Sequence, residues 1–313
     1  MKVVALAGGV GGAKLAAGLQ DVLPAGDLTV VVNTADDFDL WGLHICPDLD
    51  TVMYTLAGIA NPETGWGIVD ESFETLNMLG RYGEDTWFKL GDRDLATHVL
   101  RTDRLRSGET LTEITDKLSG ALDLASAVLP MTDDPVSTML DTPEGRLEFQ
   151  EYFVRRGQKD EVLGVELHGI EDAGPTEAVL AAISGADAII FCPSNPVVSI
   201  GPILALPGMR KALALSRAPK VAVSPIVGGR ALKGPADKML LSLGHEVSSA
   251  GVAAIYAGLV DGMVVDTVDD DDRAGIEAIG MRVLVTDSVM REAGDRARLA
   301  SETLKFGVGM VAR

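Results

Sequence analysis

Val3-Val4-Ala5-Leu6-Ala7, followed at once by Gly8-Gly9-Val10-Gly11-Gly12-Ala13-Lys14, is the stretch that decides the fold. A short, continuous apolar run bounded by turn residues is typical of a strand buried on both faces of a parallel sheet. Apolar residues over 13–23 then predict a helix, and the run at 28–33 predicts a second strand. The N-terminal stretch therefore predicts a βαβ unit with a glycine loop between its first strand and its helix.

The same alternation returns in the C-terminal half of the chain. We expect strands at 186–191, 220–223, 263–265 and 282–285, with helices beginning near 235 and 250, a helix at 272–279 and a closing helix from 287 to about 306. Strands that alternate with helices form a parallel sheet covered on both faces. The prediction is a doubly wound, Rossmann-like α/β core built from residues 1–54 and 176–313.

The intervening segment has a different pattern. Helices are expected at 71–80, 95–106 and 112–124, and a hairpin at 137–140 and 146–153 around a turn at 142–145. We therefore predict an inserted helical and antiparallel-hairpin subdomain over 55–175. A length of 313 residues agrees with about two domains, or with one large α/β unit that carries an insertion.

Composition excludes several classes of protein. The 47% hydrophobic and 23% charged residues are ordinary for a globular chain, and 27 basic against 46 acidic residues give a net charge of −19. Such a charge disfavours nucleic-acid and anionic-membrane partners, both of which attract basic surfaces. Cys46 and Cys192 match no zinc spacing, so we expect free, buried thiols. Without a signal peptide or a membrane-spanning run, we expect a cytoplasmic protein.

The glycine loop is the first candidate site. Gly8, Gly9, Gly11 and Gly12 leave room for a ligand beside the backbone, and the N-terminus of the following helix offers free N–H groups to phosphate. Leu15 follows Lys14 where a Walker loop has a hydroxyl, and Lys14 stands where a Rossmann fingerprint has its third glycine. The loop indicates a nucleotide or phosphate without specifying which, and a tight turn without ligand is the alternative.

Clustered aspartates follow the second strand. Asp36, Asp48 and Asp50 should lie beside the glycine loop, because ligands of an open parallel sheet bind beyond the carboxyl ends of its strands. Carboxylates next to phosphates suit Mg²⁺. Alternatively, Asp50 caps a helix at 51–56 and Asp36 binds a ribose hydroxyl, as in dinucleotide enzymes.

Other polar segments could complete a site. Lys89 and Arg93 are candidate cations for an anion in this acidic chain, although a surface ion pair at a helix start is the simpler interpretation. We interpret His98, in the same run, as structural. Ser194, Asn195 and Ser199 follow one C-terminal strand and Ser224 follows the next, where ligand contacts are expected and ordinary turns are the alternative.

Several motifs together resemble the 2-phospho-L-lactate transferase family, in an order that spans almost the whole chain. They lie at 8–14, 33–37, 47–51, 89–98, 130–138, 193–203 and 224–226. The family acts in the biosynthesis of the deazaflavin hydride carrier coenzyme F(420). The resemblance implies transfer of a phospholactyl group, or in some bacterial members a phosphoenolpyruvyl group, from its guanosine diphosphate conjugate to the ribityl hydroxyl of 8-hydroxy-5-deazariboflavin. GMP leaves and Mg²⁺ is required.

The resemblance also implies roles for individual residues. Asp50 and Lys89 would line the deazaflavin site, while the glycine loop with Lys14 and the loops at 193–203 and 224–226 would hold the guanosine nucleotide, together with Asn33. Val10 and Ala13 stand where some members have threonine and proline, which leaves backbone contacts to phosphate intact.

The negative charge of the donor suggests a separate role for each charged group of the site. Mg²⁺ on Asp36, Asp48 or Asp50 would screen the phosphates, Lys89 or Arg93 would meet charge on the transferred phosphorus, and an aspartate would accept the hydroxyl proton. The inserted subdomain would cover the acceptor, and a homodimer is expected because dimers are the commonest soluble oligomers.

Two other functions fit part of the pattern. A nicotinamide-dependent oxidoreductase would explain the glycine loop and Asp36, but not the altered fingerprint. A non-catalytic nucleotide-sensing protein would explain the first βαβ unit, which a related regulatory family resembles, but would not need the charged run at 89–98. Lactate and enolpyruvate donors leave no motif that separates them.

Overall fold

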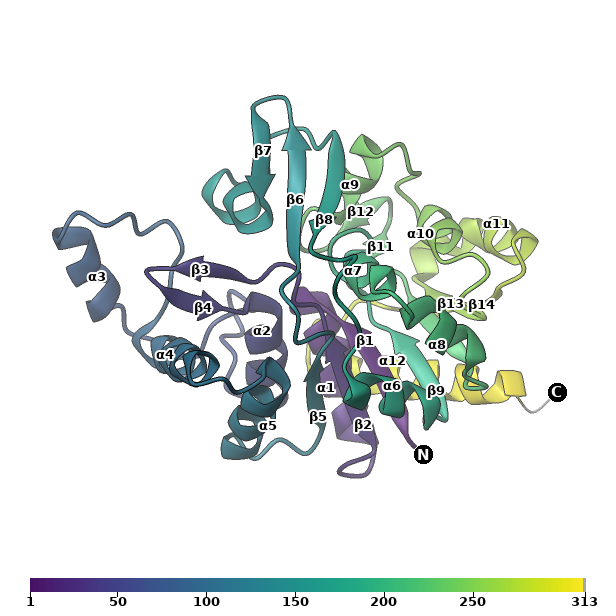
Figure 1. Ribbon diagram of the computed structural model, residues 1–313. Helices are drawn as coiled ribbons and strands as arrows, with labels where there is room; N and C mark the ends of the chain where they lie inside the picture. The colour runs from purple at the N-terminus through teal and green to yellow at the C-terminus, as the bar shows by residue number, and fades with distance from the viewer. Residues whose placement is uncertain (312–313) are drawn as a thin grey trace.

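The computed structural model describes residues 1–311, and its centre is a seven-stranded sheet in which every neighbouring pair is parallel (Figure 1). The strands are β1 (Val3–Ala7), β2 (Leu28–Val32), β5 (Ala127–Pro130), β9 (Ala188–Phe191), β10 (Lys220–Val223), β13 (Gly262–Val265) and β14 (Arg282–Val285). Their spatial order is β14-β13-β10-β9-β1-β2-β5. The expected Rossmann-like α/β fold is confirmed.

Two hydrophobic cores cover the two faces of the sheet. Along β1, Val3 and Ala5 pack into one core, while Val4 and Leu6 pack into the other, as the period of two in a strand requires. One face is covered by α1 (Gly9–Val22), α2 (Pro47–Leu56), α5 (Leu111–Ala121) and α12 (Ala293–Val311). The other is covered by α6 (Glu177–Ser184), α7 (Ile200–Ala205), α8 (Met209–Leu215), α10 (Ser249–Ile255) and α11 (Arg273–Ala278).

Smaller elements project from the carboxyl edge of the sheet. A hairpin of β3 (Phe38–Leu40) and β4 (Leu43–Ile45) lies beside α4 (Asp92–Arg106), and α3 (Glu74–Arg81) extends outward from it (Figure 1). The antiparallel sheet of β6 (Ser137–Thr142), β7 (Gly145–Glu148) and β8 (Gly164–His168) rises above the centre. The remaining elements are a π-helical turn at Glu151–Arg155, the pair β11 (Ile226–Val227) and β12 (Arg230–Ala231), α9 (Ala236–Ser242) and a 3₁₀ turn at Thr267–Asp272.

Several boundaries differ from the sequence-based expectation. The helix expected from residue 13 begins at Gly9, so most of the glycine loop is the first turn of α1. The second strand of the expected hairpin ends at Glu148, and a π-helical turn follows it. The closing helix begins at Ala293 rather than at 287. The strand β5 was not expected: it lies within 55–175 yet pairs with β2 in the central sheet, and the boundaries of the inserted subdomain stay a prediction.

The structure tests the predictions of free, buried thiols and of no membrane-spanning run. Cys46 and Cys192 are free and buried, as expected. Among residues 1–311, no helix combines the length and the apolar character that crossing a membrane would need.

Candidate active site

A cavity of about 540 Å³ opens at the carboxyl edge of the central sheet. It lies where the strand order reverses between β1 and β9, which is the usual ligand position in a doubly wound sheet. The volume is within the range of small-molecule sites. The predicted residues that line it are Gly8, Gly9, Gly11, Lys14, Asp36, Asp48, Asp50, Lys89, Ser194, Asn195, Ser199 and Ser224. Gly12, Asn33 and Arg93, which we also predicted, do not line it.

The glycines allow the β1–α1 turn to pack against the loop after β9. A Cβ on Gly11 would lie 2.3 Å from the carbonyl oxygen of Pro193, and one on Gly12 would lie 2.4 Å from Ser194 Oγ. Gly9 has a φ of +62°, in the left-handed region that favours glycine. Close contact within the protein therefore requires Gly11 and Gly12, whereas the sequence had suggested that the approach of phosphate requires them.

The N-terminus of α1 keeps donors directed toward the cavity. Gly8 is the N-cap and has no side chain to satisfy the first-turn N–H groups. Among the N–H groups of residues 9–12, Gly9 N–H alone donates to a side chain within residues 1–311, to Asp48 Oδ1 at 2.8 Å. Gly8 N–H donates to Ser194 Oγ at 3.1 Å, which ties the turn to the β9 loop. The remaining free N–H groups and the helix dipole make this end suitable for an anion.

Asp36 and Asp48 form a buried acidic pair beside that helix end. Burial raises the pKa of Asp48 to about 6, although hydrogen bonds from Gly9 N–H and from Asn33 Nδ2, at 3.1 Å, partly oppose the rise. Burial and then the charge of Asp48 raise the pKa of Asp36 well above its usual value. Asp36 Oδ1 is buried and has no hydrogen-bond partner among residues 1–311. An orphaned carboxylate oxygen next to a second buried carboxylate fits a hard divalent cation.

Asn33 does not line the cavity but holds Asp48, which does. Its side chain is fully buried, and Nδ2 donates both to Asp48 Oδ2 and to the carbonyl of Val198 at 3.2 Å. It therefore orients Asp48 and joins β2 to the loop after β9, instead of lining the nucleotide pocket as predicted.

Asp50 is already compensated by a buried arginine. Arg101, which is fully buried on α4, donates from Nη1 to Asp50 Oδ2 at 3.0 Å, and its Nη2 contacts Asp50 Oδ1. The ion pair occupies both carboxylate oxygens, which leaves less capacity for a metal. The alternative role as an N-cap was wrong: α2 begins at Pro47, its N-cap is Cys46, and Asp50 lies in its first turn.

Tyr54 and two further residues of α4 extend this polar cluster. Tyr54 donates its hydroxyl hydrogen bond to Asp94 Oδ1 at 2.8 Å, and His98 Nε2 lies 3.2 Å from the same oxygen. His98 Nδ1 lies 3.6 Å from Asp50 Oδ2. Asp50, Asp94 and His98 are close enough to hold a metal ion together, as are Asp37, His44 and Cys46. Arg101 already neutralises Asp50, so Asp36 and Asp48 suit a cation better than the first of these groups does.

Aromatic side chains also line the cavity. Tyr54, Trp66, Phe88, Phe149 and Phe153 all line it. Such walls can stack on a planar ring.

The two cations predicted near these walls differ in position. Lys89 lines the cavity and is exposed, and its amino group makes no ion pair or hydrogen bond with residues 1–311. The Arg93 guanidinium donates instead to the Val69 carbonyl at 3.2 Å, outside the cavity, so the structure places only Lys89 where it can meet a substrate.

The loops after β9 and β10 line the cavity, but two of their polar side chains form hydrogen bonds within the loops. Asn195 Oδ1 accepts from Val197 N–H at 2.9 Å, and Ser224 Oγ donates to the Ile226 carbonyl at 3.0 Å. Ser199 lines the cavity and is nearly buried. The turn interpretation of Asn195 and Ser224 therefore holds alongside their position at the cavity wall.

The model of the family described as "2-phospho-L-lactate transferase CofD" matches residues 3–296. The chain belongs to the CofD family. It is 45% identical over 312 residues to a phosphoenolpyruvate transferase of Streptomyces griseus, a match that covers 98% of each chain. It is 41% identical over 308 residues to a 2-phospho-L-lactate transferase of Methanosarcina acetivorans, again over 98% of each. This CofD protein is therefore an enzyme that transfers a phosphoryl-containing group, which decides against the sensor and oxidoreductase alternatives.

A solved structure supports the fold. A UPF0052-family protein of Bacillus halodurans superposes with a TM-score of 0.67 at 17% identity, over 97% of this chain and 98% of that one. At this identity the likeness concerns the fold alone.

Sequence reasoning interpreted His98 as structural but did not connect it, Asp94 or Arg101 with Asp50. Asp94, His98 and Arg101 lie at i, i+4 and i+7 of α4 and so share one helix face, and Asp50 and Tyr54 share a face of α2 in the same way. That spacing was the available signal. It was overlooked because charged residues on a helix usually face solvent.

Proposed function

We propose that this CofD enzyme transfers a phospholactyl or phosphoenolpyruvyl group from its guanosine diphosphate conjugate to the ribityl hydroxyl of 8-hydroxy-5-deazariboflavin, and releases GMP, in coenzyme F(420) biosynthesis. One observation carries the proposal. The N-terminus of α1, the loops after β9 and β10, several aromatic side chains, Asp50 and Lys89 all line a single cavity. This arrangement supports a site in which donor and acceptor meet in one cavity.

Positioning and charge account for most of the expected catalysis, as in other phosphoryl transfers. The N–H groups at the start of α1 would hold the donor phosphates, and Lys89 would face the transferred phosphorus. Arg101 holds Asp50 rigidly at the wall, where the carboxylate can orient the attacking hydroxyl.

Asp36 and Asp48 are the residues that would hold Mg²⁺. When bound there, the cation would neutralise phosphate charge beside a chain of net charge −19. The orphaned Asp36 oxygen and the raised pKa values of both carboxyls support this assignment. The cytoplasmic location and the homodimer stay predictions.

The decisive experiment mixes purified protein, Mg²⁺ and the deazaflavin with each guanosine donor separately, and follows GMP by chromatography. We expect GMP and the coupled deazaflavin product in equal amounts, with one donor preferred. A reaction without the deazaflavin is the control for simple donor hydrolysis. If neither donor gives product above this control, the proposed function is wrong.

A further inference from the structure

Two lysines stand over the N-terminal end of α1 without an acidic partner. Lys14 belongs to α1 itself, and Lys233 lies on the exposed loop between β12 and α9, more than two hundred positions away in sequence. Both line the cavity. Within residues 1–311, neither amino group has a carboxylate at ion-pair distance, although acidic residues outnumber basic ones 46 to 27. Cations gathered without partners in so acidic a chain point to an anionic ligand.

Packing brings the two lysines toward the same point. A Cβ on Gly65 would lie 2.8 Å from Val10 Cγ1 and 3.0 Å from Lys233 Nζ, so Lys233 reaches the residue one helical turn before Lys14. Lys233 Nζ also donates to the Thr64 carbonyl at 3.0 Å. The loop around Thr64 and Gly65 is thereby tied across the cavity, above the start of α1.

Both ammonium groups keep donors for a ligand. Lys14 Nζ donates one hydrogen bond, to the Met290 carbonyl at 3.1 Å, and Lys233 Nζ donates one, to Thr64. Since a lysine ammonium has three donors, each retains two. Burial, followed by the charges of Lys233 and Arg296, lowers the pKa of Lys14, in agreement with crowded positive charge that an anion would relieve.

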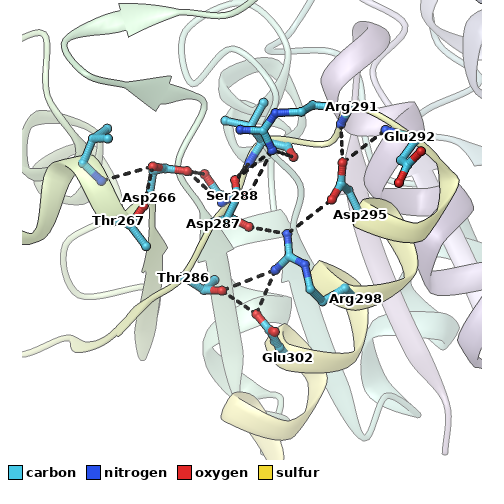
Figure 2. Close-up of polar contacts among 12 residues, drawn as sticks. Asp266, Thr267, Thr286, Asp287, Ser288, Arg291, Glu292, Asp295, Arg298 and Glu302 are labelled. Carbon is cyan, nitrogen blue, oxygen red and sulfur yellow. Dashed lines mark hydrogen bonds and ion pairs between the residues drawn. The ribbon is translucent and has the colours of Figure 1, made fainter.

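The segment beneath Lys14 is held firmly in place. Figure 2 shows Asp266 accepting hydrogen bonds from Ser288 N–H, at 2.8 Å, and from Ser288 Oγ, at 3.1 Å. Arg298 donates to the Asp287 carbonyl at 2.6 Å from the opposite side. Met290 lies two residues after Ser288, so the carbonyl that accepts from Lys14 Nζ belongs to a segment anchored on both sides.

We propose that Lys14 and Lys233 form a clamp on the diphosphate of the guanosine donor, and that Lys233 also ties the loop at 61–67 over it. The identity of the base, guanosine, rests on the proposed function. The negative charge of the ligand is inferred from the two lysines and does not depend on that proposal. A nucleoside diphosphate has more negative oxygens for two cations than a monophosphate has. The clamp should therefore favour GDP over GMP, and it should favour inorganic pyrophosphate over phosphate.

Calorimetry with GDP, GMP and inorganic pyrophosphate tests the clamp. The variants are Lys233→Met, the conservative Lys233→Arg, and Lys238→Met as the matched control, because Lys238 is a nearby exposed lysine outside the cavity. Lys233→Met loses a charge-assisted hydrogen bond, so we expect it to bind GDP and pyrophosphate about 10- to 150-fold more weakly than the wild type. Its loss of GMP affinity should be smaller. Lys233→Arg should recover the affinity for GDP and pyrophosphate. Lys238→Met should bind like the wild type.

The outcomes separate the clamp from the proposed function. Equal losses for GDP and GMP in Lys233→Met would mean that Lys233 only anchors the loop, and unchanged GDP binding would mean that it plays no part; either result overturns the clamp. If the wild type binds pyrophosphate but not GDP, and Lys233→Met weakens pyrophosphate binding, the clamp holds while the guanosine donor is wrong. Failure to bind either ligand overturns both.

Discussion

Deprotonation of Asp48 should destabilise the metal-free enzyme as the pH rises through the mildly acidic range. Burial raises the pKa of this carboxyl from 3.8 to about 6 in the folded chain. Between these values the native state still binds the proton that the unfolded chain has released, so stability falls with increasing pH. At about 1.36 kcal/mol per pKa unit, the full cost above pH 6 is about 3 kcal/mol. About 1 kcal/mol of this cost arises between about pH 5 and pH 7.5.

Urea unfolding in the presence of a chelator measures the effect, with tryptophan fluorescence as the signal. Wild type and Asp48→Asn are compared at pH 5 and pH 7.5, because other carboxyls, Asp36 among them, change both proteins. We expect the wild type to lose about 1 kcal/mol more than the variant over this interval. Equal losses, or a larger loss in the variant, would refute the argument that the buried Asp48 carboxyl gives this region its pH dependence.

Repeating the unfolding measurements with Mg²⁺ in place of the chelator tests whether Asp48 holds the cation. A cation bound by Asp36 and Asp48 competes with the proton, so its stabilising effect should be larger at pH 7.5 than at pH 5. In Asp48→Asn the magnesium effect should be small at both values. A magnesium effect of the same size in wild type and variant would place the cation elsewhere.

Three further substitutions test other parts of the site. Lys89→Ala should weaken deazaflavin binding about 10- to 150-fold in a fluorescence titration and leave GDP affinity nearly unchanged, whereas the opposite pattern would assign Lys89 to the donor. Gly11→Val forces a side chain against the Pro193 carbonyl, 2.3 Å from the Cβ position, so we expect a lower melting temperature and loss of GDP binding by calorimetry. A stable variant with normal affinity would contradict this. Arg101→Met leaves Asp50 buried without its partner, at a cost of about 3–5 kcal/mol in urea unfolding. Adding Asp50→Asn should recover much of that loss, and no recovery would show that the ion pair is not its source.

The sequence was sufficient for six of the seven strands of the central sheet, because local pattern specifies them. The run at 3–7 is buried at every position, and the alternation of strands and helices after residue 180 can only be closed as a parallel sheet. The strand β5 was missed because it has four residues and ends in Pro130, which suggests a turn. The start of α1 was missed because glycine is a poor helix former, and contacts with the loop at 193–194 override that preference.

The site was predictable in outline, since ligands of such a sheet bind beyond the carboxyl ends of its strands. Its internal partners were not, because they depend on contacts between distant segments. Arg101 lies 51 positions from Asp50 and Lys233 lies 169 from Thr64, and no local pattern records such separations. For Arg93 the local pattern was misleading: it is close to Lys89 in sequence, but the turn into α4 directs it to the Val69 carbonyl.

Asp48 and Asp50 show how one short run produces two different environments. Residues two apart on a helix do not face the same side, so α2 turns Asp48 toward the start of α1 and Asp50 toward α4. There Asp50 meets Arg101, which satisfies both of its oxygens, while Asp48 meets only neutral donors beside a second buried acid, Asp36. The compensated carboxylate is fixed and suited to orient a hydroxyl. The uncompensated pair lacks a positive charge, and this difference, which composition cannot show, is the reason that we propose Asp36 and Asp48, and not Asp50, as the cation site.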